Sequence, residues 1–226
     1  MLQDFPNGVL KMADEPLAWT PEPQAWAQQG SNALLMLLCG LLLLLGIRDL
    51  FILFKPMLQG LGRWRMLVYT EHNIQLAHRR NKLALLASPT IVLCCNAFHL
   101  LPFPLWGCAL SIFLYWLARE ILFRSIRHKK VQSEAWHAAH GSLYLFVILL
   151  CLLMLLIGVP GKLFGMPEDI LRALMYALCI LIFAINCLRS GQILASQCGP
   201  FRSFLYLCTL EFLPAALLLC AALFYI

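Results

Sequence analysis

Long apolar runs without charge, each close to the length needed to cross a bilayer, constrain this chain more than any other feature. The first run has an uninterrupted core at residues 33–47 with no charged side chain. A hydrocarbon layer about 30 Å thick is crossed by about 20 helical residues. Because 62% of the 226 residues are apolar and only 12% are charged, a soluble fold would lack polar residues to cover its surface. The sequence therefore predicts an all-α, polytopic membrane protein.

Six runs fit this length, and we predict that each forms a transmembrane helix. Pro102 and Pro104 separate the second run from the third and predict a tight hairpin turn, because proline interrupts helices. Residues 1–32 hold four prolines and no apolar core of a signal peptide, so we predict a tail outside the membrane domain. The predicted spans are 33–54, 83–101, 105–123, 141–159, 170–188 and 203–226, and together they form one six-helix domain, 33–226.

The basic residues of the connections predict the orientation. On one side the connections carry 12 Lys and Arg residues, whereas the other side carries three. Because basic connections stay in the cytoplasm, both termini are predicted to be extracytoplasmic, which agrees with an even number of crossings. Residues 64–69 of the first basic connection mix aromatic, apolar and basic side chains, and they predict an interfacial helix on anionic headgroups.

Charged residues inside the predicted spans are the candidate functional residues, because a charge in hydrocarbon is costly. Counted at 1.5 Å per residue, Glu211 lies roughly 12 Å from the cytoplasmic side, too deep to reach the headgroups. We expect it to face the bundle and to pair with Arg119 or Arg48. Such a pair is either an interhelical staple or a proton- or ion-binding carboxylate. The candidate cluster in the cytoplasmic half consists of Glu211, Arg119, Glu120, Arg48 and Asp49.

For four of these residues we favour a plainer interpretation. Arg48 and Arg119 can extend to the headgroups and pair with the acids that follow them, Asp49 and Glu120.

Pro214, three residues after Glu211, frees a backbone carbonyl in the preceding turn.

Asn96, His99, His137 and His140 are secondary candidates. The first two could extend a polar path outward from Glu211, although we favour a histidine that is hydrogen-bonded to a carbonyl near the outer interface. His137 and His140 are three residues apart and share a helical face, but two histidines fall short of a metal site. We therefore predict neither a metal nor a cofactor. Signatures of hydrolases, metalloproteases and nucleotide-binding loops are missing from the sequence.

The C-terminal stretch 204–214 resembles the closing signature of a family of uncharacterised integral membrane proteins from Bacteroidota, known only as a domain of unknown function. That family carries a Tyr-Leu-Cys-x-Leu-Glu-x-Leu-Pro-like run in its last helix. The resemblance implies an inner (cytoplasmic) membrane location with periplasmic termini, and it implies no activity. The matching positions here are Tyr206, Leu207, Cys208, Leu210, Glu211, Leu213 and Pro214.

Three functions stay open. We favour a non-enzymatic subunit or accessory factor of an envelope assembly, whose partners are the lipid bilayer and other membrane proteins of the envelope. The alternative is a small proton- or ion-coupled transporter that uses Glu211. The third is an intramembrane lipid-modifying enzyme with His137, His140 or Glu134 near the headgroups. A nucleic-acid partner is not predicted, because the net charge of +6 follows the membrane boundaries.

Overall fold

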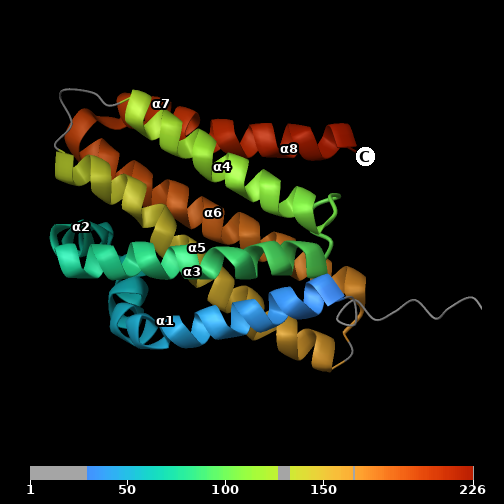
Figure 1. The fold of residues 1–226 in the computed structure, drawn as a ribbon. Coiled ribbons are helices and arrows are strands. Elements are labelled where there is room, and N and C mark those ends of the chain that lie inside the picture. The colour runs from blue at the N-terminus through green and yellow to red at the C-terminus, as the bar shows by residue number, and fades with distance from the viewer. Residues whose placement is uncertain (1–29, 127–132, 165, 226) are drawn as a thin grey trace, which may run out of the picture.

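The computed structural model describes residues 30–126, 133–164 and 166–225, and these are almost wholly helical (Figure 1). Of the described residues, 92% are helical and none lies in a strand, which confirms the predicted all-α, polytopic fold. Of the predicted tail, residues 1–32, only residues 30–32 are described, and they form the start of α1. The elements are α1 (Gly30–Gly62), α2 (Trp64–His72), α3 (Ile74–Ala97), α4 (Leu105–Ser125), α5 (Ser133–Leu163), α6 (Glu168–Cys198), α7 (Pro200–Leu207), the π-helical turn η2 (Cys208–Phe212) and α8 (Leu213–Tyr225).

Five helices of the described chain are long and apolar enough to cross a membrane. The predicted span 83–101 is not among them, because α3 ends at Ala97 and its apolar part follows Arg79, Arg80 and Lys82. α3 nevertheless runs the length of the bundle, packed against α1 and α5 (Figure 1). The five stretches are Met36–Gly62, Leu105–Ser125, Ala135–Lys162, Glu168–Gln197 and Pro200–Leu223.

α5 is the central helix of the bundle. It packs against α6, α3 and α2, and 56% of its most apolar stretch is buried, compared with 17% for α1 and for the last stretch. The long helices run up and down, so that α1 begins and α8 ends at the same end of the bundle (Figure 1). α1 and α8 lie at the outside of the bundle and leave most of their apolar side chains exposed, as expected of helices that face lipid.

The two connections on either side of α3 differ in form. α1 continues through Pro56 to Gly62, so residues 55–62, predicted as part of a loop, are helical. Residues 64–69 lie in α2, which buries Leu67 against the bundle. The predicted turn at Pro102 and Pro104 is confirmed, because α3 ends at Ala97 and α4 begins at Leu105.

Candidate functional site

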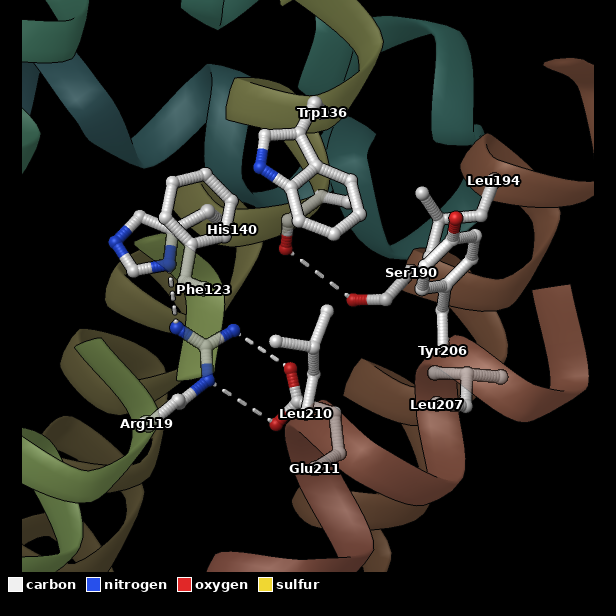
Figure 2. A pocket seen from close by; sticks show the side chains of 11 residues that line it. Arg119, Phe123, Trp136, His140, Ser190, Leu194, Tyr206, Leu207, Leu210 and Glu211 are labelled. Carbon is white, nitrogen blue, oxygen red and sulfur yellow. Dashed lines mark hydrogen bonds and ion pairs between the residues drawn. The ribbon is translucent and has the colours of Figure 1, made fainter. Parts of the chain in front are cut away.

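A buried ion pair joins α4 to the π-helical turn in the last span (Figure 2). Arg119 Nη2 lies 2.6 Å from Glu211 Oε1, and Arg119 Nε donates to Glu211 Oε2 at 3.4 Å. The two side chains are only 4% and 2% exposed. Of the two partners predicted for Glu211, the structure therefore places Arg119 against it.

The local backbone explains how Glu211 faces α4. Pro214 has no N–H, and in a regular α-helix its ring would press against the carbonyl four residues earlier. In η2 the turn is wider, and the N–H of Leu213 reaches back to the carbonyl of Cys208, five residues earlier. Such π-helical turns are rare and often occur at functional sites. The interrupted backbone expected near Pro214 is present, and Glu211 lies inside the widened turn.

His140 of α5 continues this network. Arg119 Nη1 lies 2.9 Å from His140 Nδ1. A guanidinium can only donate hydrogen bonds, so Nδ1 must accept, and the neutral imidazole carries its proton on Nε2. That nitrogen lies 3.2 Å from Glu120 Oε2 and 3.2 Å from the hydroxyl of Tyr144. A chain of polar contacts thus leads from buried Glu211 to Glu120, whose side chain is 34% exposed.

Aromatic rings enclose the polar groups. Phe123 stacks on His140 with centroids 3.9 Å apart and on Trp136 with centroids 5.0 Å apart. Tyr206 meets the ring of Trp136 edge-on at 5.4 Å. The cavity between them has room for about one water molecule (Figure 2). Because bulk water is excluded here, the charges interact more strongly than they would at the surface.

The favoured pairing between neighbouring residues is wrong for Arg119 and Glu120. Arg119 is 3% exposed and does not extend to the headgroups. Glu120 instead accepts from Arg124 Nε at 2.8 Å and lies beside His140. The physical reason is that consecutive helical residues point about 100° apart, so that one faces the bundle interior while the next faces its edge.

The same pairing is also wrong for Arg48 and Asp49. Asp49 pairs with Lys82 Nζ at 3.0 Å and with Arg79 Nη1 at 3.5 Å, both from α3. Arg48 is exposed, and it has no ion-pair partner among the residues that the structure describes. Asp49 therefore belongs to a separate contact between α1 and α3, and Arg48 to neither group.

Asn96 lies in the last turn of α3 and His99 in the turn that follows, and within the described chain no hydrogen bond or ion pair leads from either to Glu211. The outward path is therefore not formed. The favoured alternative is also absent. His99 is exposed with φ 48°, and within the described chain its ring makes no hydrogen bond. Its backbone N–H donates to the carbonyl of Asn96 instead.

His137 and His140 share a helical face, as predicted, and both contact the ring of Phe123. His137 is exposed, whereas His140 is enclosed by the site. The side chain of Glu134 lies outside the described residues. In the described parts of the chain, no three Cys, His, Asp or Glu side chains come together as a metal-binding group.

A second buried ion pair was missed because Arg80 looked like an ordinary basic loop residue. Arg80 is 3% exposed and its Nη1 lies 2.7 Å from Glu71 Oε2. Its guanidinium lies against Gly141 and over the ring of Tyr144, 5.8 Å from the centroid. Tyr144 was not predicted as a site residue either, and its spacing of four residues from His140 on the same helix was the available signal.

A neutral polar group lies beside the cavity at the contact of α5 with α6. Ser142 Oγ is 2.9 Å from Ser190 Oγ and donates to Asn186 Oδ1 at 3.1 Å. All three side chains are at most 2% exposed. None of the three was predicted as a site residue, and the available signal was the four-residue spacing of Asn186 and Ser190 on one helix.

Comparisons of the chain with protein-family models, curated proteins and solved structures found no match. The resemblance of stretch 204–214 to the Bacteroidota family therefore stays a prediction.

Proposed function

We propose that the chain is a non-enzymatic subunit or accessory factor of an envelope assembly in the inner membrane. In this proposal its basic connections lie in the cytoplasm and both termini lie outside. The Arg119–Glu211 pair is then an interhelical staple that fastens the last span to α4.

The single observation that carries this proposal is that the ion pair is closed. Both carboxylate oxygens of Glu211 accept from Arg119, and the third guanidinium nitrogen bonds His140. The neighbouring cavity has room for about one water molecule, which is too little for a transported solute. A carboxylate that binds a substrate or a metal ion needs acceptor positions that the ligand can reach, and the positions that Arg119 leaves on Glu211 are buried beside a cavity of about one water molecule.

The test is extraction of the full chain from its native membrane in a mild detergent, followed by size separation and quantitative identification of co-migrating proteins. We expect a complex of fixed stoichiometry that is larger than the 226-residue chain. An unrelated helical protein from the same membrane, tagged in the same way, is the control for shared detergent micelles. A chain that migrates alone would count against the proposal.

A proton- or ion-coupled carrier is the second candidate, and one observation favours it. Polar contacts connect Glu211 through Arg119 and His140 to half-buried Glu120, at distances of 2.6–3.2 Å. Glu211, His140 and Glu120 can each exchange a proton, and they reach from a buried carboxylate toward the surface, while the guanidinium of Arg119 holds them together and keeps its own proton.

Purified chain in liposomes with an internal pH-sensitive dye would test the carrier. Proton flux that is lost in Glu211→Gln but kept in Asp49→Asn would support it, since Asp49 lies in the separate α1–α3 contact. Liposomes that show no flux above empty controls would remove this candidate.

A further inference from the structure

A hollow lies at the end of the bundle opposite the Arg119–Glu211 pair. It is formed where the turn after α3 meets the facing ends of α5 and α6, and its wall includes Phe98, His99, Lys162, Glu168 and Arg172. We call it the α3–α6 hollow. Three separate elements contribute a basic side chain to it, and none of these residues takes part in the site described above.

Arg172 is the residue in this hollow that lacks partners. Its Nε is shielded from solvent and has no hydrogen-bond partner. Glu168 lies one helical turn earlier, yet within the described chain Arg172 forms no ion pair with it or with any other acid. A guanidinium has five donors in a fixed fork, and a covered donor without an acceptor is costly. This arrangement calls for an external group that brings acceptor oxygens.

Lys162 supplies a second cation that is held in place by the fold. Its Nζ donates to the carbonyl of Ala97 at 3.2 Å and lies 5.6 Å above the ring of Phe98. The ring fits there because Gly158 has no side chain, since a Cβ at that position would lie 2.4 Å from Phe98 Cζ. One of the three ammonium donors is used in this contact, so two are left for a ligand.

The charges of the wall define the kind of anion. Lys162 and Arg172 contribute two positive charges and Glu168 one negative charge, so the hollow favours a ligand with a single negative charge. A phosphodiester carries one negative charge and two oxygens that suit the fork of an arginine.

The position of the hollow favours a lipid over a free anion. Lys162 ends one candidate membrane span, and Arg172 lies four residues, roughly 6 Å, inside the next. This is the level of the headgroup phosphates. Phe164 lies between Lys162 and Glu168 in the connection from α5 to α6 and exposes 87% of its surface, where an acyl chain can pack.

We propose that the rim of the α3–α6 hollow, whose interior has room for about one water molecule, binds the phosphodiester group of a membrane phospholipid, with Arg172 and Lys162 as its donors. Arg172 donates from its terminal nitrogens, and its covered Nε joins the contact when the guanidinium shifts toward the ligand, whereas Lys162 uses its free ammonium donors. Glu168 stays beside the headgroup and keeps dianionic phosphate groups out.

Photo-crosslinking tests this proposal on the full chain in detergent micelles. A photoactivatable phosphatidylglycerol should label peptides that contain residues 97–101 or 162–172, and unlabelled phosphatidylglycerol should compete. Arg172→Ala should lower the labelling of these peptides about tenfold, the typical loss for one charge-assisted hydrogen bond. Glu168→Gln, in the same wall, should leave it unchanged or raise it, which separates loss of a donor from damage to the fold.

Two results would overturn the assignment. One is labelling of these peptides in Arg172→Ala at the wild-type level while the variant keeps the wild-type far-UV circular dichroism spectrum. The other is competition by millimolar inorganic phosphate as effective as that by the lipid, because a site for the free anion would not need the membrane level or the exposed apolar side chain of Phe164. The competition arm uses wild-type protein, so it stands even if a variant fails to fold.

Discussion

Replacing Glu211 by leucine should destabilise the bundle by about 3–5 kcal/mol, the usual cost of removing one partner from a buried ion pair. The structure gives the reason. Arg119 Nη2 and Nε would lose their acceptors at 2.6 Å and 3.4 Å, and only the contact with His140 would be left. Arg119 is 3% exposed, and a guanidinium cannot give up its proton, so its charge would stay buried without a counter-ion.

The opposite single change should cost less. Arg119→Met leaves the carboxyl of Glu211 buried, but a carboxyl can take up a proton and become neutral, so we expect a loss of about 1–3 kcal/mol. The double variant Arg119→Met/Glu211→Leu fills the site with apolar groups of similar size. It should fall within about 1 kcal/mol of the wild type, which gives a coupling energy of at least about 3 kcal/mol.

The assay is reversible unfolding in mixed micelles of rising dodecyl sulfate content, followed by far-UV circular dichroism. Wild type, both single variants and the double variant form a complete double-mutant cycle. If the double variant lost as much stability as the two single variants together, Arg119 and Glu211 would not be coupled and the ion-pair argument would be refuted. Single losses below about 1 kcal/mol would refute the burial argument.

Three further changes probe other contacts. Gly141→Ala should lower the free energy of unfolding by about 1–3 kcal/mol, because the added Cβ would lie 2.3 Å from a guanidinium nitrogen of Arg80. Gly40→Ala is the matched control, because no atom lies within 4 Å of its Cβ, and it should be close to neutral in the same unfolding assay. His140→Phe keeps the ring stacking but removes the acceptor of the α4 guanidinium, so we expect a loss of about 1–3 kcal/mol in unfolding free energy, against less than about 0.5 kcal/mol for exposed His137→Phe. Tyr176→Phe removes a 2.8 Å hydrogen bond to the turn after α3, and amide exchange in that turn, read by mass spectrometry, should become about fivefold faster; unchanged exchange would mean that this hydroxyl does not hold the turn.

Depth in the membrane could be predicted from the sequence, but depth did not choose the partner of Glu211. Counted from the cytoplasmic ends of their predicted spans, Glu211 lies roughly 12 Å deep, Arg48 about 9 Å and Arg119 about 6 Å, and the structure joins Glu211 to Arg119. Rotation about the helix axis could not be predicted in the same way. Arg48 is near the same depth, but its helix turns it outward while Asp49 faces α3. Spacing along one helix carries no information about which face a neighbouring helix covers.

Arg80 shows a second limit of the sequence. As one of several basic residues between two apolar runs, it looked like a charge that fixes orientation. Its burial depends on Glu71 of α2 and on the absence of a side chain at Gly141 of α5, and the latter lies 61 positions along the chain. Such burial becomes visible only when the helices are placed side by side. The apolar part of α3 is short because the first turns of this helix carry charged side chains, Arg80 among them.

The widened turn around Glu211 also sets the phase of everything that follows it. One residue more than a regular α-helical turn holds rotates the downstream helix by about 100°. α8 therefore presents a different flank to α4 than an uninterrupted helix of the same sequence would present. Deleting one residue of η2 other than Glu211 would bring back the regular helix and leave the leucines of α8 on their present side, because the turn holds one residue more than a regular helix needs. α7 and α8, on either side of η2, can thus each take the rotation about the helix axis that suits its own contacts, because the π-helical turn separates the two.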